Sequence, residues 1–498
     1  MNEPLLLGID VGTTSVKLAI FDLDGQLQAE IRTPYETHRY GGLHVEQKPD
    51  EWMRAILQGL VEMQARLPSS TIAAIGLTSQ VNTHVFVDDN GAAVLPAIVW
   101  QDGRASEQAR QLDARLSEAQ RLSWWGAPMP IDASHALARA QWLKETEPAL
   151  WSRTRQVLLP KDYCIQALTG VSVTDPLSNI GMVGLDGDWV DELHALVPGT
   201  RERLPPLADM ASIAGRIRDD LPFAGTPVAV GTMDAWAGLF GCAVTAEGHG
   251  LYLSGTSEIL GIVSETVTPT PGVLVMPRVH DMTLHVGPTQ SGGASQSWLC
   301  ELLQITPDEM SALAGKHERR APAPLFLPHL QGERAPLWDA SARGVFIGLD
   351  ASTDRAAMAY AIYEGVAHSA RWLLDSLQAS AGTTLKVMNG GGGGFRSDVW
   401  NQLRADVLGV HLQRMAVTDP GTLGAAGLAA VATGHFDSTI AAFDTLVHVD
   451  RVFTPDASRA DQLAERHALF RDTYAATREL SHRWLGGSPQ LGDSYQSV

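Results

Sequence analysis

The same local pattern occurs once in each half of the chain: an apolar strand, a turn of glycine and threonine, and a second apolar strand. In the first half, the apolar run 5–10 leads into Gly12-Thr13-Thr14, and in the second half the run 250–254 leads into Gly255-Thr256-Ser257. Short repeats with periods of about 20–50 residues, the signature of stacked-repeat folds, are not visible. The sequence therefore predicts a fold duplicated at the scale of half the chain, with the boundary near residues 246–250.

The residues around these turns alternate between strand and helix patterns. After Pro49, apolar residues recur at helical spacing up to Met63, and residues 72–78 form another apolar run. In the second half, a strand at 385–388 is followed by a run of glycines and then by a helix at 397–408. This order predicts an α/β fold in which mixed sheets are flanked by helices.

Composition excludes several classes of protein. The chain has 498 residues and a formal net charge of −19. That length allows about two to four domains with large cores, and the acidic charge argues against a nucleic-acid-binding surface. The three cysteines are far apart in the sequence, which fits a reducing cytosol and favours neither a disulfide framework nor a zinc site.

The N-terminus does not predict a signal peptide, and the most apolar window does not predict a membrane span. Met1-Asn2-Glu3-Pro4 lacks the positive charge of a signal peptide. The most apolar long window, 225–244, contains Asp234 and several glycines, which fits a buried strand, turn and helix better than a membrane span. We therefore expect a cytoplasmic protein.

Both glycine turns are candidates for phosphate binding. Glycine lets backbone N–H groups approach a ligand, and successive N–H groups form an anion-binding nest. The five glycines at 390–394 precede a helix, whose N-terminus adds partial positive charge. Taken singly, each turn also suits an ordinary hairpin, and the glycine run also suits a hinge. Two matched turns together with a helix start favour a polyphosphate ligand.

Asp10 and Lys17 flank the first turn. A carboxylate beside a phosphate site is unfavourable unless a cation lies between them, so Asp10 predicts Mg²⁺ held partly through water; a turn-initiating role is the alternative. Lys17 could reach back to a phosphate as a point charge, or it could be an ordinary exposed strand lysine. The only Gly-Lys pair, Gly315-Lys316, is followed by His317, so the chain has no P-loop motif.

Asp234 is the candidate general base. An apolar run at 226–230 is followed by Gly231-Thr232-Met233-Asp234 and a small-residue stretch at 235–243, which predicts a strand, a tight turn and a helix beginning at Asp234. Aspartate is a good helix N-cap. Phosphoryl transfer needs positioned phosphates, a metal and a carboxylate that orients and deprotonates the attacking hydroxyl. Asp234 could fill both roles.

Together these segments resemble the FGGY carbohydrate kinases of the actin-like ATPase superfamily, over nearly the whole chain. The resemblance begins with the phosphate motif that runs from Gly8 to Lys17. The other matching segments are His44-Val45-Glu46-Gln47 with Pro49 and Trp52, Pro96-Ala97-Ile98-Val99-Trp100-Gln101-Asp102-Gly103-Arg104, Leu158-Leu159-Pro160-Lys161-Asp162-Tyr163, Gly332-Glu333-Arg334-Ala335-Pro336, Gly344-Val345-Phe346-Ile347-Gly348-Leu349, and Gly392 to Ser397 with Trp400, Gln402 and Asp406.

The resemblance implies an α/β fold of two actin-like (ribonuclease H-like) domains, each a mixed β-sheet flanked by helices, with an interdomain cleft. We expect an N-terminal domain at 1–246, a C-terminal domain at 247–486 and a flexible tail at 487–498. The resemblance also implies ATP and Mg²⁺ as cofactors, with Asp10 at the metal and Asp234 as the catalytic base. The residues expected to bind ATP are Gly12, Thr13, Thr14, Lys17, Gly255, Thr256, Gly392, Gly393, Gly394 and Ser397. The residues expected to bind the sugar are Gln80, Val81, Asn82, Trp100, Asp102 and Asp234.

Members of this family phosphorylate a terminal hydroxyl of a small sugar or polyol. This chain resembles most the members that act on ketopentoses, so D-xylulose, giving D-xylulose 5-phosphate, is the first expectation. Some positions depart from the pattern. Val81-Asn82-Thr83 stands where Met-His-Gly is common, and Ala235-Trp236 follows the base. The family pattern also expects a lysine near Arg139 and an acidic or amide residue where Ala357 stands. A bulky Trp236 could reshape the sugar pocket.

These departures leave alternatives open. Another family member's substrate, such as ribulose, erythrulose or glycerol, is the nearest, because one changed partner in a hydroxyl-reading site can switch the substrate. A nucleotide-driven binding switch and a catalytically silent sugar sensor are further readings. We also expect the protein to form a homodimer, and we expect it to bind neither nucleic acid nor membranes.

Overall fold

The computed structural model describes residues 4–67, 71–126, 128–276, 278, 282–317, 323–417 and 419–485. The chain forms two compact units. The first comprises Met1–Thr245, Met276–Asp281 and Asp419–His448, and the second comprises the remaining segments. The expected division at 246/247 lies one residue from the first boundary, but two segments of the expected C-terminal domain are grouped with the first unit. The expected tail at 487–498 lies outside the described residues.

The described part of the first unit has a central seven-stranded sheet. Its order is β10-β11-β6-β1-β2-β3, with β12 also paired to β6. β1 runs parallel to β6 and antiparallel to β2, so the sheet is mixed. β1 is buried throughout, as expected of an apolar strand covered on both faces. The bounds are β1 (Leu5–Val11), β2 (Ser15–Phe21), β3 (Leu27–Pro34), β6 (Ile72–Ser79), β10 (Ile213–Arg216), β11 (Pro227–Ala229) and β12 (Thr232–Met233).

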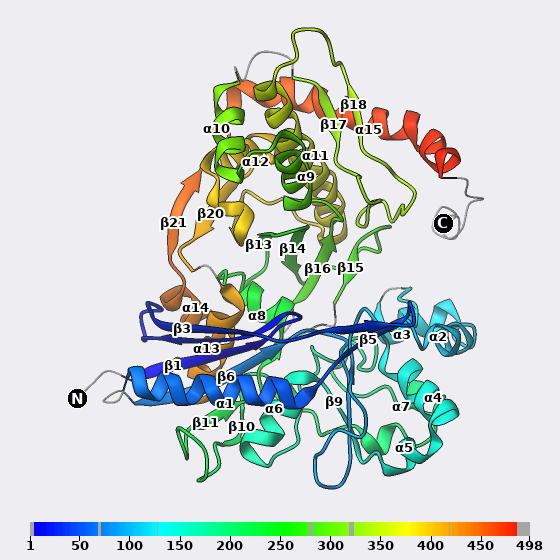
Figure 1. Cartoon of the computed structure of the whole chain (residues 1–498), viewed down its shortest axis with the longest axis vertical. Helices are drawn as coiled ribbons and strands as arrows, with labels where there is room; N and C mark the ends of the chain where they lie inside the picture. The colour runs from blue at the N-terminus through cyan, green and yellow to red at the C-terminus, as the bar shows by residue number, and fades with distance from the viewer. Residues whose placement is uncertain are drawn as a thin grey trace. The chain divides into compact units, whose positions relative to one another are not determined.

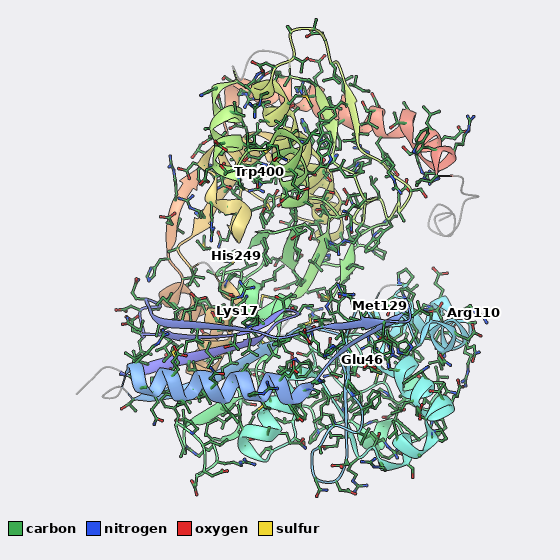
Figure 2. All side chains as sticks on the ribbon, in the orientation of Figure 1. Lys17, Glu46, Arg110, Met129, His249 and Trp400 are labelled. Carbon is green, nitrogen blue, oxygen red and sulfur yellow. The ribbon has the colours of Figure 1, made fainter. Side chains whose placement is uncertain are left out.

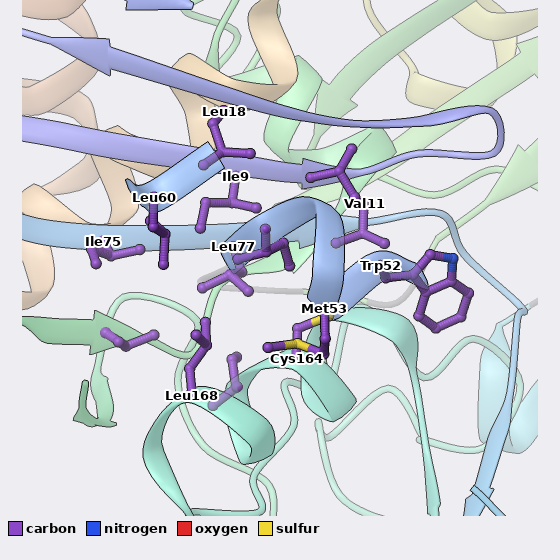
Figure 3. Packing of buried hydrophobic residues seen from close by; sticks show 14 of the residues in the cluster. Ile9, Val11, Leu18, Trp52, Met53, Leu60, Ile75, Leu77, Cys164 and Leu168 are labelled. Atoms are coloured by element: carbon purple, nitrogen blue, oxygen red, sulfur yellow. The ribbon is translucent and has the colours of Figure 1, made fainter. Parts of the chain in front are cut away.

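Helices cover both faces of this sheet, and the two-residue period of the strands sorts the side chains between them. Ile9 and Val11 of β1 point toward α1 (Pro49–Arg66) and α6 (Pro160–Thr169), where they join Trp52 in one apolar cluster (Figure 3). Gly8, on the opposite face, meets the backbone of α13 (Pro420–Ala432). α13 in turn packs on α8 (Asp234–Phe240), as Figure 1 shows.

Smaller elements complete the first unit. Two small sheets, β4-β5-β8 and β7-β9, lie outside the central sheet. The bounds are β4 (His38–Tyr40), β5 (His44–Gln47), β7 (Val85–Val87), β8 (Ala97–Ile98), β9 (Gln156–Leu158), α2 (Ser106–Asp113), α3 (Glu118–Trp125), α4 (Ala136–Thr146), α5 (Pro148–Arg153), α7 (Asp191–His194), η1 (Arg201–Arg203) and α14 (Thr439–Leu446).

The second unit is built around another mixed sheet. In the described residues it has seven strands in the order β15-β16-β14-β13-β19-β20-β21, with β13 parallel to β19 and antiparallel to β14. The bounds are β13 (Gly250–Ser254), β14 (Glu258–Ser264), β15 (Leu274–Val275), β16 (Thr283–Pro288), α9 (Gly293–Leu303), α10 (Pro307–Lys316), β17 (Leu325–Leu327), β18 (Val345–Ile347), α11 (Arg355–Ala381), β19 (Val387–Gly391), η2 (Gly393–Arg396), α12 (Asp398–Leu408), β20 (His411–Met415), β21 (Val449–Phe453), η3 (Ala457–Arg459) and α15 (Ala460–Trp484).

The predicted architecture is confirmed: each unit is a mixed β-sheet flanked by helices. The order of strand, glycine turn and strand occurs in both units, as β1–β2 and β13–β14. Among the described helices, none is both long enough and apolar enough to span a membrane.

Candidate active site

Asp10 and Asp234 lie at the carboxyl ends of parallel strands in the first unit. Asp10 of β1 is in register with Thr78 of β6, and Thr78 is in register with Thr232 of β12. Asp234 follows β12 as the first residue of α8. Ligands of open α/β sheets bind outside the carboxyl ends of the strands, and the fold brings the two predicted carboxylates to that edge.

Asp234 is the first residue of α8, one position after the N-cap. The N-cap is Met233, which makes no side-chain capping bond. The Asp234 carboxylate accepts a hydrogen bond from its neighbour, Ala235 N, over 2.8 Å. The side chain is partly exposed. The predicted N-cap role is therefore wrong, and the carboxylate is left accessible at the sheet edge.

Lys17 is held between two carboxylates. It stands opposite Asp10 in the β1–β2 register, with Nζ 3.3 Å from Asp10 Oδ2. Nζ also forms an ion pair with Asp419, at the start of α13 (Figure 2 labels Lys17). Lys17 is only partly exposed. The alternative that Lys17 is an ordinary exposed strand lysine is therefore wrong.

Burial perturbs all three predicted charges. It raises the pKa of Asp10 to about 6, although the neighbouring Lys17 pulls in the opposite direction. Burial likewise raises the pKa of Asp234 to about 7, and the charge of Asp10 adds to the effect. Burial alone would lower the pKa of Lys17, but Asp10 and Asp419 together raise it. Lys17 therefore stays charged, and Asp234 can exchange a proton near neutral pH.

The surroundings of Asp10 fit a hydrated Mg²⁺. Asp10 Oδ1 is buried and has no hydrogen-bond partner in the structure. Glycines border the carboxylate: a Cβ on Gly12 would lie 3.6 Å from Oδ2, and one on Gly421 would lie 4.0 Å away. No three described His, Cys, Asp or Glu side chains could hold a metal by themselves. Mg²⁺ needs only one or two carboxylates, because it keeps waters and shares substrate phosphates.

Helix α13 brings Asp419 to this site through backbone contacts that only glycine allows. A Cβ on Gly8 of β1 would lie 1.9 Å from Thr422 O, and one on Gly76 of β6 would lie 1.8 Å from Ala425 O. The sequence reasoning missed Asp419. The signal that could have found it is Asp419-Pro420 followed by a run of Gly and Ala, since proline favours the first turn of a helix and small residues allow close packing.

Gln47 connects the phosphate turn to the expected sugar site. It is fully buried, and its Nε2 donates to Thr13 O over 2.8 Å. Its Oε1 accepts from Gln80 Nε2, also over 2.8 Å. Thr13 Oγ1 lies 3.4 Å from the indole nitrogen of the exposed Trp100. Gln80, Trp100 and Thr13 are thus brought together, and Gln47 is a further residue that the site prediction did not include.

The buried carboxylate of Asp102 is occupied by other protein groups. It accepts hydrogen bonds from Val45 N over 2.5 Å and from Arg104 Nη2 over 2.7 Å. Arg104 also forms an ion pair with Glu46, the strand neighbour of Gln47 (Figure 2 labels Glu46). These contacts order the loop that carries Trp100. Sugar binding by Asp102 stays a prediction.

The loop after β6 is held by Arg139. Val81 and Asn82 are partly exposed, and Asn82 has a left-handed φ of 51°. The fully buried Arg139 donates to Asn82 O over 2.5 Å and to Val99 O over 2.6 Å. It thereby connects the Asn82 loop to the strand end before Trp100.

Trp236 packs in the interior of the first unit. It is fully buried, with its ring 5.8 Å from that of Phe240. Its effect on the shape of the sugar pocket stays a prediction.

In the second unit, Gly255 and Thr256 form the exposed turn between β13 and β14. The start of α9 closes on this turn: Gly293 N donates to Gly255 O over 2.9 Å, and Ala294 N donates to Thr256 O over 3.0 Å. The sequence reasoning did not include α9. A Gly-Gly pair at 292–293 before a helical pattern was the available signal.

The second glycine segment of this unit follows β19. Gly392 and Gly393 are exposed, and Gly394 is partly buried. Ser397 caps α12, because its side chain accepts from Trp400 N over 3.2 Å. β13 and β19 are paired in parallel, so the segments with Gly255 and Gly392 follow adjacent strand ends. The predicted nucleotide residues of the second unit are thereby gathered at one sheet edge.

The comparisons with known proteins agree with this geometry. Residues 5–241 match the model of the N-terminal domain of the FGGY family of carbohydrate kinases, and residues 250–433 match that of its C-terminal domain. A xylulose kinase from Staphylococcus epidermidis is 28% identical over 97% of this chain and 98% of its own length. A glycerol kinase from Deinococcus radiodurans is 29% identical over 92% of this chain and 94% of its own length.

A solved structure has the same fold. The ligand-bound xylulose kinase from Lactobacillus acidophilus superimposes with a TM-score of 0.86 at 25% identity, over 97% of this chain and 100% of that protein. The two mixed sheets flanked by helices are therefore the actin-like fold that the sequence predicted. With both family domains matched along the sequence, the chain belongs to the FGGY family of carbohydrate kinases.

Proposed function

We propose that this carbohydrate kinase transfers the γ-phosphate of ATP to the terminal hydroxyl of D-xylulose. The observation that carries the proposal is the pair of carboxylates, Asp10 and Asp234, at one sheet edge, with burial raising the pKa of Asp234 to about 7. A carboxyl group with such a pKa suits a general base at neutral pH. The names of several relatives, among them the Staphylococcus epidermidis protein, supply the sugar.

In the proposed reaction, Asp234 accepts the proton of the sugar's terminal hydroxyl as that oxygen attacks the γ-phosphorus. A new P–O bond forms to the sugar, and the bond from the γ-phosphorus to the bridging oxygen of ADP breaks. The products are the sugar phosphate, ADP and a proton on Asp234, which is released to solvent. The protein contributes mainly positioning and charge stabilisation, as is general in phosphoryl transfer.

We assign the metal to Asp10. A bound Mg²⁺ would neutralise charge developing on the phosphates, and its charge would keep the Asp10 carboxylate ionised. Lys17 holds the Asp10 carboxylate from the other side, and the turn of Gly12, Thr13 and Thr14 offers backbone N–H groups to phosphate oxygens.

We assign nucleotide binding in the second unit to the two glycine segments. The exposed turn of Gly255 and Thr256 would contact the γ-phosphate, and the segment of Gly392, Gly393 and Gly394 with Ser397 would line the adenosine site. Both segments follow strand ends in the same sheet, which supports their joint use.

We assign the sugar to the first unit. Trp100, 41% exposed, offers an apolar face for the carbon backbone of the sugar, and the loop of Gln80, Val81 and Asn82 offers polar groups for its hydroxyls. Asp102 contributes by ordering the Trp100 loop through Arg104.

A panel of substrates tests the proposal. D-xylulose, D-ribulose, erythrulose, gluconate and glycerol are compared for ADP release in a coupled assay with Mg²⁺ present. Glycerol is the second candidate, because a glycerol kinase is 29% identical to this chain. We expect the highest kcat/KM with D-xylulose. A higher value with glycerol would overturn the choice of sugar, and ATP hydrolysis that no sugar accelerates would favour the nucleotide switch.

We further propose a cytoplasmic location. The three cysteines, Cys164, Cys242 and Cys300, are all buried and form no disulfide with one another, which supports a reducing compartment. The expected homodimer is tested by measuring the molar mass of the purified protein in solution.

A further inference from the structure

A completely buried ion pair, Glu258 with Arg404, lies in the second unit. Both side chains have 0% exposure, and Arg404 Nη2 is 3.0 Å from Glu258 Oε1. The guanidinium carbon lies over the ring of Trp400, 3.9 Å from the ring centre (Figure 2 labels Trp400). Arg404 belongs to α12, and Glu258 is the first residue of β14.

Arg404 also bonds both segments that we assign to the nucleotide. Its Nη2 donates to Ser254 Oγ over 2.7 Å, and Ser254 immediately precedes the turn of Gly255 and Thr256. Its Nη1 donates to Gly394 O over 3.0 Å. One rigid guanidinium therefore fixes the distance between the phosphate turn and the glycine segment after β19.

The packing around the pair leaves no space for other side chains. A Cβ on Gly394 would lie 1.9 Å from Ser254 Oγ, and a Cβ on Gly392 would lie 2.5 Å from Ser254 O. On the other side, a Cβ on Gly292, just before α9, would lie 2.5 Å from Glu258 Oε1. The segments before α9, after β13 and after β19 thus converge on the same two side chains.

Stability alone is a weak reason for such a pair. Burying two charges costs about as much as their attraction returns, and well-packed apolar residues can replace a buried pair without loss of stability. What an apolar pair cannot supply is directed hydrogen bonding from a planar fork to several acceptors. Here the acceptors, Ser254 and Gly394, are parts of the two candidate nucleotide segments.

We propose that Glu258 and Arg404 are positioning residues for the nucleotide: Glu258 orients Arg404, and Arg404 sets the spacing of the two glycine segments that bind ATP. The inference rests on the proposed nucleotide binding by those segments. Neither side chain contacts the nucleotide, since both are fully buried.

Three variants test this role. Arg404→Lys keeps the charge but loses the fork, and Glu258→Gln keeps the shape but loses the charge. The double variant Glu258→Leu with Arg404→Met removes both charges together, so no uncompensated charge remains buried. Arg466→Lys is the matched control: Arg466 pairs with the buried Glu364 between α15 and α11 and donates to Ala323 O, and neither partner belongs to the glycine segments.

The measurements are ADP affinity by titration calorimetry, KM for ATP and for the sugar, and the thermal unfolding midpoint. We expect each of the three variants to bind ADP roughly tenfold or more weakly, since small displacements of binding groups are costly, while the KM for the sugar stays within about twofold. We expect the double variant to stay folded, with a midpoint above those of the two single variants because it leaves no unpaired buried charge. We expect Arg466→Lys to keep wild-type ADP affinity even where its midpoint falls.

Two results would overturn the inference. One is wild-type ADP affinity in the folded double variant. The other is a loss of ADP affinity in Arg466→Lys equal to that in Arg404→Lys, which would reveal a general loss of structure. If the wild-type protein itself binds no ADP, the proposed function and this inference both fail. If it binds ADP but phosphorylates no sugar, only the choice of reaction fails.

Discussion

Asp10 and Lys17 face each other across the β1–β2 pair, 3.3 Å apart, and the lysine is shared with Asp419 from the far end of the sequence. We expect Asp419→Asn to lower kcat by about tenfold, because Lys17 would then turn fully onto the Asp10 carboxylate that we assign to the metal. The Mg²⁺ concentration for half-maximal rate should rise as well. Asp450→Asn, at an exposed pair with Arg414, serves as control. Wild-type kinetics in Asp419→Asn would contradict this role.

Asp234→Asn should reduce phosphate transfer by roughly 10²–10⁴-fold, the range of a lost general base. Binding of ADP and sugar, measured by calorimetry, should persist. The raised pKa of Asp234 also predicts a stability change: a carboxyl with a raised pKa stabilises the fold fully below its usual pKa and loses this contribution as pH rises through about 7. The variant should therefore melt above the wild type at high pH, and less so in acid. Turnover close to wild type would disprove the base assignment.

The pH profile provides a separate test of the same group. Since the base must be ionised, and since burial raises the pKa of Asp234 to about 7, kcat/KM should fall as pH drops below about 7. Rates are measured at constant ionic strength and saturating Mg²⁺. The residual rate of Asp234→Asn should lack this acid limb. A wild-type profile that stays flat well below pH 7 would show that another group takes the proton.

Gln47→Met should uncouple the phosphate turn from the sugar loop. The substitution keeps the volume but removes the bonds to Thr13 and Gln80, and it leaves buried polar groups unpaired at a cost of about 1–3 kcal/mol. We expect a lower kcat and a higher KM for the sugar, with ADP affinity in the second unit unchanged. Thr37→Val is the comparison: it removes one bond to Gln47 and one to Thr13 O, but it leaves Gln47 bonded to both Thr13 and Gln80. An equal effect of both variants would argue for general destabilisation.

Gly424→Ala should destabilise the first unit strongly, because the new Cβ would lie 1.8 Å from the carbonyl oxygen of Ala237 in α8. Backbone cannot move aside without separating the helices, so we expect a loss of about 1–3 kcal/mol, typical of overpacking. Gly427→Ala, on the same helix, is the matched comparison: its Cβ would meet side-chain atoms of Phe443 rather than backbone. Urea unfolding measures both, and equal losses would contradict the backbone argument.

Local patterns predicted much of this fold. The apolar runs, the Asp-x-Gly turn and the helical spacing after Pro49 specify β1, β2 and α1 through contacts close in sequence. Val85–Val87 likewise forms a strand, β7, but it pairs with β9 outside the central sheet. Alternation identifies a strand, whereas its partner depends on residues far along the chain.

The candidate site shows the same limit. Asp10, Lys17 and Asp234 could be proposed from the sequence because each follows or flanks a readable turn. Asp419 could not, since its relation to Lys17 depends on how α13 packs rather than on its neighbours. Arg404 was equally hidden: within its helix it reads as an ordinary polar residue, and only the fold reveals that it is buried against Glu258.

The contacts of α13 with β1 and β6 determine when the first unit can complete its fold. Gly8 and Gly76 present their bare backbone to a helix that begins at Pro420. During synthesis on the ribosome, this face of the sheet therefore lacks α13 until residues 419–448 have been made. A gene divided near residue 245 would yield an N-terminal fragment that lacks its own covering helix, whereas a separately supplied 419–448 peptide could restore it.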